Sequence, residues 1–420
     1  MNLTEKINSI FKNNLYALSL YSRQIAGTLV LFIIARYLSV YDYGVFSSYK
    51  AIVGFILTFA CLGYNEYILV SSRNNVRMVS QKIALFMTNA FLIVAGTIFV
   101  SLFVPIDLHL IFILVVIRAF FDSTFFALIL PYFQASKKLN TIGVINITYS
   151  VFVMLIAVIS YLFKLSLLKF LLLSCFIGLI NFIQCSLYTK TNYLFVLFKP
   201  IHYLKLLDKS ILGYIGVIVA FLLYSQIPSL FVSTYLSKED AALYFSALTI
   251  ASVIGLLISA QNQKIVPEMI KAPVDEVKIL IKNNFKLIMS INTFIFIIFA
   301  ISGKQLLQLI YGQEYYGNGV WLLLIFTISN ISLALANIYG AYITASGNQH
   351  LKVKYQSVSI AISIITLVIT YKLGIYSAAL AYFLSAGYIG LVYMHKTKQL
   401  LTIQKKGEQN GRTNLLQITR

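Results

Sequence analysis

Long apolar stretches separated by short polar segments recur along the whole chain. Each stretch is roughly 20 residues long, which lets a helix rising about 1.5 Å per residue cross a hydrocarbon core of about 30 Å. Polar and apolar residues do not alternate within the stretches, as they would in the strands of a membrane β-barrel. The pattern predicts twelve spanning helices, over residues 15–38, 45–70, 82–104, 108–135, 141–163, 165–188, 210–236, 241–266, 284–303, 317–346, 354–372 and 374–394.

Composition supports the same fold class. The chain is 59% hydrophobic and only 11% charged, whereas a soluble domain carries about 25% charged residues. Only helices and closed barrels satisfy backbone hydrogen bonds in lipid. We therefore predict an all-α polytopic membrane protein.

The positions of the basic residues predict how the helices are oriented. Most of the 33 lysines and arginines fall in or at the edges of alternate connections and in the two ends of the chain, including Arg73, Arg77 and Lys82, the last at the start of the third span. Cytoplasmic segments are rich in Lys and Arg, so both termini are predicted to be cytoplasmic. The net charge of +20 is spread over these segments. It therefore indicates contact with membrane lipids and not with nucleic acid.

Residues typical of metal, redox or hydrolytic chemistry form no recognisable motif. Cys61, Cys175 and Cys185 all fall inside predicted spans, and the four histidines stand singly. An odd number of buried thiols is neither a disulfide framework nor a zinc site. No nucleotide-binding or hydrolase signature has its required context. The sequence predicts no metal, no cofactor and no enzymatic activity.

The chain contains a weak internal repeat. Residues 37–49 match residues 235–247 at a constant offset, with Ser39 and Asp42 aligned to Ser237 and Asp240. Both segments are predicted outward hairpins, six spans apart, which indicates a parallel duplication. The predicted parts are an N-terminal six-helix lobe at 1–190, a cytoplasmic linker at 191–209, a C-terminal six-helix lobe at 210–395 and a basic cytoplasmic tail at 396–420.

Several short motifs resemble those of a known family. They are the YLS-x-x-D hairpin after the first span, the ensuing Gly63 region, Gln261–Pro267, Leu309–Tyr316 and Gly340–Gly347. In their order and spacing they are similar to O-antigen (Wzx-like) flippases of the MOP superfamily, which also holds lipid II flippases and MATE drug exporters.

The resemblance implies two six-helix lobes around a central cavity that opens alternately to the two sides of a bacterial inner membrane. The implied cargo is an undecaprenyl-pyrophosphate-linked oligosaccharide, turned over for O-antigen, lipopolysaccharide or related polysaccharide biosynthesis. A polysaccharide polymerase and chain-length machinery are the implied protein partners.

Three basic residues, Arg23, Lys50 and Arg118, lie more than four residues from either end of a predicted span. A charge at bilayer depth costs at least about 2.5–3.5 kcal/mol, so it normally faces a cavity or a partner. Arg23, beside Gln24, is predicted to hold the pyrophosphate, because a guanidinium matches phosphate oxygens bidentately. Lys50 either extends this cationic track or reaches to the outer interface.

Two acidic residues have alternative interpretations. Asp122 is four residues from Arg118 and therefore on the same helical face. The two form either an internal ion pair, which we favour, or a gate or ion-coupling pair. Glu66 is either a coupling carboxylate or a solvated acid paired with Arg73 or Arg77.

The second lobe offers mainly uncharged polar candidates. They are predicted to contact sugar hydroxyls or to form hydrogen bonds between helices, with Pro228 as a hinge. These candidates are Gln226, Gln261, Asn262, Asn330, Asn337 and Tyr339.

Two other functions fit the same architecture less well. A MATE-like exporter of organic cations needs acidic cavity residues, but the charges in the spans are mainly basic. A membrane polysaccharide polymerase usually needs a large outward loop or a carboxylate cluster, and no predicted outward loop exceeds about 15 residues.

Overall fold

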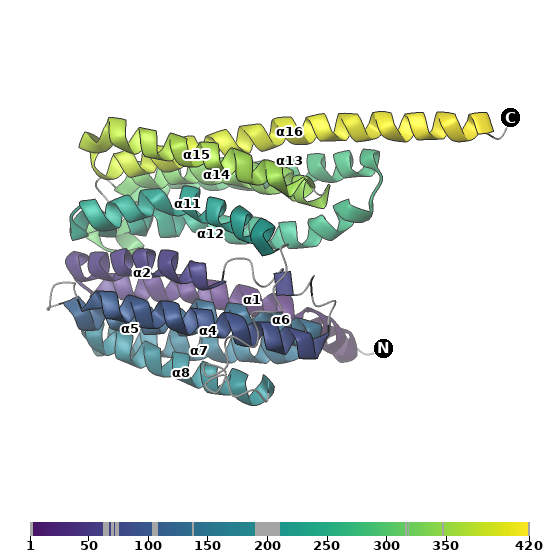
Figure 1. Cartoon of the computed structure of the whole chain (residues 1–420). Coiled ribbons are helices and arrows are strands. Elements are labelled where there is room, and N and C mark those ends of the chain that lie inside the picture. The colour runs from purple at the N-terminus through teal and green to yellow at the C-terminus, as the bar shows by residue number, and fades with distance from the viewer. Residues whose placement is uncertain are drawn as a thin grey trace. The chain divides into compact units, whose positions relative to one another are not determined.

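A computed structural model of the chain describes residues 3–61, 67–68, 71, 75–102, 108–136, 138–189, 211–315, 317, 319–346 and 348–418. The ordered elements in these residues are helical (Figure 1). The chain divides into two compact units, one formed by Met1–Leu222 with Val232–Ala242 and the other by Leu223–Phe231 with Leu243–Arg420. The linker predicted at 191–209 lies outside the described residues.

The first unit is built mainly from the helices before residue 190. They are α1 (Leu3–Tyr37), α2 (Val40–Cys61), α4 (Val76–Ser101), α5 (His109–Ala119), the π-helical turn η2 (Phe120–Phe125), α6 (Phe126–Ala135), α7 (Leu139–Leu162) and α8 (Leu167–Thr189). Its core contains large aromatic side chains, among which Phe46, Phe125 and Phe170 are fully buried.

The remaining helices follow the undescribed segment. They are α11 (Ile211–Tyr235), α12 (Lys238–Lys271), α13 (Val274–Ile310), α14 (Gly319–Ala345), α15 (Gln349–Thr370) and α16 (Ile375–Ile418), with short 3₁₀ turns η3 (Gln313–Tyr315) and η4 (Tyr371–Leu373). In the second unit α14 and α16 approach closely: a Cβ atom on Gly390 would lie 2.6 Å from the Ser332 carbonyl oxygen.

The helices confirm the predicted fold class. Each of the twelve predicted spans overlaps one helix, where α5, η2 and α6 together form the span predicted at 108–135. Residues 62–66 and 69–70 of the second predicted span lie outside the described residues. In the described part of the chain, nine helices are long and apolar enough to cross a membrane. Many apolar side chains on them are exposed, including Leu162 and Ile369, as expected for surfaces that face lipid. The protein is a multi-pass membrane protein.

Several helices run past the spans predicted from hydropathy. The span predicted at 284–303 is part of a 37-residue helix, and the span predicted at 374–394 continues as helix to Ile418. Hydropathy falls where lysines begin, but Lys, Glu and Gln are good helix formers. The apolar pattern therefore predicts the membrane-spanning part of each helix and not its ends.

The repeated Tyr-Leu-Ser motif has the same local structure at both places. The Asp42 backbone N–H donates to Ser39 Oγ at 3.0 Å, at the start of α2. The Asp240 backbone N–H donates to Ser237 Oγ at 3.1 Å, at the start of α12. A serine in front of a helix satisfies one of its unpaired N–H groups in this way. The motif is thus a helix-capping signature in both halves of the chain.

Candidate functional site

The candidate site begins with an irregular turn in the fourth span. Regular helix ends at Ala119 and resumes at Phe126, and the residues between them form a π-helical turn. Such turns inside α-helices are rare and are frequent at functional sites. Asp122 lies in this turn, and Arg118 lies just before it.

The predicted Arg118–Asp122 ion pair is present. Arg118 Nε donates to Asp122 Oδ2 at 3.1 Å, and both side chains are largely buried. The other carboxylate oxygen accepts a hydrogen bond from the Tyr149 hydroxyl of α7. Arg118 also lies near the rings of Phe46 and Phe170, with its guanidinium carbon 5.5 and 5.0 Å from their centroids.

Arg23 of α1 is held by neighbouring groups on the other side of Asp122. Its Nη1 donates to Asn146 Oδ1 at 3.0 Å, and its Nη2 donates to the Asp122 backbone oxygen. The guanidinium carbon lies 4.1 Å from the Phe126 ring centroid and 4.3 Å from that of Tyr149. Arg23 is half-buried. The guanidinium expected to hold a pyrophosphate is therefore engaged with three other helical segments in this structure.

These contacts define one network, which we call the arginine cluster: Arg23, Arg118, Asp122, Asn146 and Tyr149. It contains two guanidinium groups and one carboxylate, so it carries a net positive charge. Nη1 of Arg118 is buried and has no hydrogen-bond partner among the residues that the structure describes. The cluster therefore keeps a donor on a charged group that could bind an anion.

Lys50 extends the positive charge of the cluster. It lies on α2 with an exposed side chain, close enough to Arg118 and Asp122 to interact with both electrostatically. An ammonium near a buried guanidinium that has an unused donor can bind an anionic group together with it. The described part of the first unit thus offers a cationic patch within its spans.

The other predicted site residues are not part of this cluster. Gln24 is exposed on α1, and Gln226 is half-buried in the second unit. Gln261 and Asn262 lie on α12, but their side chains are outside the described part of the structure, as is Glu66 altogether.

In the second unit the structure gives hydrogen bonds between helices. Asn330 is buried, and its Nδ2 donates to the Ala251 backbone oxygen at 2.8 Å, joining α14 to α12. This contact fits the structural interpretation of Asn330. Asn337 on the same helix is exposed.

Sequence analysis missed two members of the arginine cluster and did not predict the burial of a further lysine. Asn146 and Tyr149 are three residues apart in an apolar span, and this spacing on one helical face was a usable signal. Lys82 was expected on the cytoplasmic side at the start of the third span, and its burial was not predicted. It is buried in α4, which begins earlier than that span, at Val76, and its Nζ donates to Ser71 Oγ at 2.6 Å.

No protein-family model and no curated protein matches the chain. Solved structures match it in fold. An inward-facing multidrug resistance MATE family transporter of the MOP superfamily is 12% identical, with 91% of this chain and 96% of that chain covered and a TM-score of 0.61. A MATE protein in its straight conformation is 15% identical, with 94% and 97% covered and a TM-score of 0.59.

A third match is a MOP superfamily transporter from Pyrococcus furiosus, described as having a binding pocket of reversed polarity that suggests a different function. It is 11% identical, with 94% of this chain and 96% of that chain covered and a TM-score of 0.61. At such low identities the likeness shows the fold alone. The chain has the fold of these transporters.

Proposed function

We propose that this protein is a membrane transporter that moves a lipid-linked oligosaccharide, carried on undecaprenyl pyrophosphate, from the cytoplasmic to the periplasmic leaflet by alternating access. It would serve O-antigen or related surface polysaccharide synthesis in a bacterial inner membrane, next to a polymerase and chain-length machinery. One observation carries this proposal: the cationic patch that Lys50 and the arginine cluster form within the spans of the first unit.

The charge of the patch is complementary to a pyrophosphate. Within the described part of the spans predicted from sequence for the first unit, Asp122 is the only carboxylate, because Asp42 stands at the start of α2 before the predicted span. Asp122 already accepts hydrogen bonds from Arg118 and Tyr149. Arg23, Arg118 and Lys50 together outweigh it. Lys50 and Nη1 of Arg118 are the groups that contact the pyrophosphate in this proposal, because one is exposed and the other has an unused donor. Arg23 acts by positioning Asp122 and α7.

The competing function is export of a small organic cation, which the MATE-type fold accommodates equally well. A cationic cargo would need a free carboxylate, whereas Asp122 is engaged. The P. furiosus transporter, described as having a pocket of reversed polarity, supports the view that this fold can serve cargoes of different charge.

A genetic experiment tests the proposed function. Deleting the gene should remove surface polysaccharide and leave the lipid-linked oligosaccharide on the cytoplasmic face, and the wild-type gene should restore export. Lys50→Gln should fail to restore it at wild-type protein level. Lys169→Gln, which removes an exposed lysine from α8, is the matched control and should restore export. Normal surface polysaccharide in the deletion strain would overturn the proposal.

A further inference from the structure

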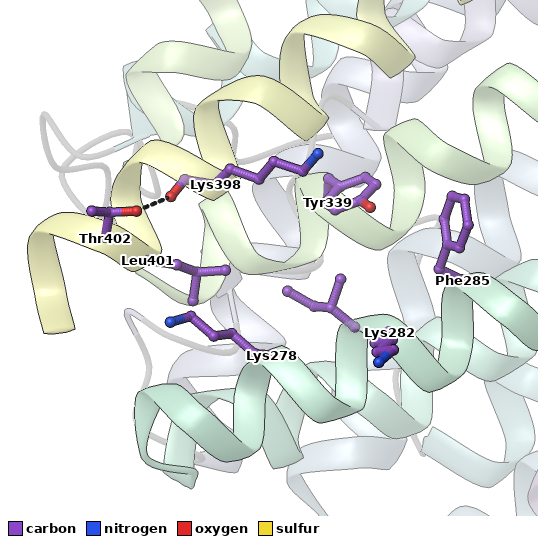
Figure 2. Close-up of a pocket in the computed structure, with 8 residues that line it drawn as sticks. Lys278, Lys282, Phe285, Tyr339, Lys398, Leu401 and Thr402 are labelled. Atoms are coloured by element: carbon purple, nitrogen blue, oxygen red, sulfur yellow. Dashed lines mark hydrogen bonds between the residues drawn. The ribbon is translucent and has the colours of Figure 1, made fainter.

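The second unit contains a pocket that is separate from the arginine cluster. It has a volume of about 350 Å³ and lies between α13, α14 and α16. Figure 2 shows that α13 supplies Lys278, Lys282 and Phe285, while Tyr339 comes from α14 and Lys398 and Leu401 come from α16. The whole lining belongs to one compact unit.

The pocket is strongly basic. Three lysines line it, and the described residues of the lining include no acidic side chain. The nearest ion pair joins Lys278 Nζ to Asp275 Oδ1 at 3.8 Å, and both side chains are substantially exposed. An ion pair with such a long separation and such exposed side chains contributes little to the stability of the fold. The lysines of the pocket thus favour an anionic ligand.

The floor of the pocket is apolar. Leu401 is buried, and Phe285 packs partly buried against the same hydrophobic core. Lys278 and Lys282 are four residues apart on α13, so they lie on one helical face with Phe285 one turn further along. An inorganic anion would leave this apolar surface unused. The arrangement instead matches a molecule with an anionic head and an apolar body.

The pocket lies where membrane helices pass into the basic segments beyond the membrane. Lys278 and Lys282 precede the predicted span at 284–303, and Lys398 follows the predicted span at 374–394. The positive-inside pattern places this end of the second unit at the cytoplasmic interface. Basic pockets between helices at that depth suit phospholipid headgroups.

We propose that this pocket binds the headgroup of an anionic phospholipid of the cytoplasmic leaflet, with the lysines around the phosphate and the start of an acyl chain over Phe285 and Leu401. Its volume lies at the small end of the range for ligand pockets, which suits a headgroup. The inference does not depend on the cargo, because it uses no residue of the arginine cluster.

Native mass spectrometry of the purified full-length protein with phosphatidylglycerol tests this site. The triple variant Lys278→Gln, Lys282→Gln, Lys398→Gln should bind phosphatidylglycerol about 100-fold more weakly, since each basic residue near an anionic lipid contributes about fivefold. The matched control is Lys286→Gln, Lys354→Gln, Lys396→Gln, which removes three lysines outside the pocket from α13, α15 and α16. The affinity of this control variant for phosphatidylglycerol should stay within about threefold of that of the wild-type protein. The wild-type protein, the pocket triple variant and the control triple variant should have the same unfolding temperature in lipid-free detergent.

Three results would overturn the proposal. An equal loss in the control triple variant would show that general surface charge attracts the lipid. Equal binding of phosphatidylcholine would show that the headgroup charge is not recognised. Displacement of phosphatidylglycerol by millimolar inorganic phosphate would identify a soluble-phosphate site.

Discussion

Arg23 on α1 and Asn146 on α7 are joined by a hydrogen bond of 3.0 Å from Nη1 to Oδ1, across 123 residues of sequence. The same guanidinium donates to the backbone oxygen of Asp122. One charged side chain therefore ties the first and fifth spans to the π-helical turn of the fourth. This contact makes Arg23 a structural element of the first unit in addition to a source of positive charge.

Arg23→Ala should destabilise the first unit. The variant leaves Asn146 and the Asp122 carbonyl without their charged donor, and a hydrogen bond to a charged group contributes about 1.5–3 kcal/mol. The thermal unfolding temperature of the purified protein in detergent should therefore fall. Gln24→Ala, at an exposed neighbouring position, should leave it unchanged. An unaltered unfolding temperature for Arg23→Ala would contradict the structural role.

Arg118 and Asp122 should behave as a coupled pair. Each single alanine variant leaves a largely buried charge without its partner, whereas the double variant removes both charges. A double-mutant cycle on thermal stability should give a coupling free energy of about 0.5–3 kcal/mol. Additive effects of the two substitutions would argue against the ion pair.

Gly178 on α8 should be intolerant of a side chain. A Cβ atom there would lie 2.7 Å from Cβ of Phe121 in the π-helical turn. Gly178→Ala should therefore displace the turn that carries Asp122 and cost about 1–3 kcal/mol through overpacking. Gly96→Ala is the control, because among the described residues the new methyl group would meet no atom within 4 Å apart from its chain neighbours and its own helix backbone. Equal unfolding temperatures for the two variants would refute the close approach.

Gly390 on α16 makes the corresponding prediction for the second unit. Gly390→Ala would bring Cβ to 2.6 Å from the Ser332 carbonyl oxygen and push α14 and α16 apart. We expect a loss of about 1–3 kcal/mol in stability. Gly387→Ala on the same helix should be neutral or stabilising, because its methyl group would contact no packed neighbour within 4 Å in the described part of the chain. Limited proteolysis in detergent should digest only the Gly390 variant faster; resistance equal to wild type would count against the packing.

The spans were predictable because a membrane requires long apolar segments, and length alone then places each helix. Arg23, Arg118 and Asp122 were each predictable as candidates because charges at bilayer depth are costly and rare, but the contact that joins Arg23 to Asp122 was not predicted. Asn146 and Tyr149 escaped attention because uncharged polar residues are common in spans and have many structural uses.

The burial of Lys82 could not be predicted from the sequence. The residue stands at the edge of an apolar stretch, where sequence does not distinguish a buried lysine from one in a loop. Its placement depends on tertiary contacts with Ser71 and with the Tyr67 ring, 4.6 Å from Nζ. The basic pocket was equally inaccessible to sequence, because its lysines come from helices more than 100 residues apart.

Flipping in reconstituted vesicles tests the central claim most directly. Wild-type protein in liposomes should move a fluorescent oligosaccharide linked to undecaprenyl pyrophosphate across the bilayer, measured as label that becomes inaccessible to an external quencher. Lys50→Gln should slow this movement at least about tenfold, as expected for an interaction of about 1.4 kcal/mol or more with the pyrophosphate, while Lys169→Gln should not. Transport of a small organic cation by the wild-type protein, with no movement of the lipid-linked oligosaccharide, would contradict the account.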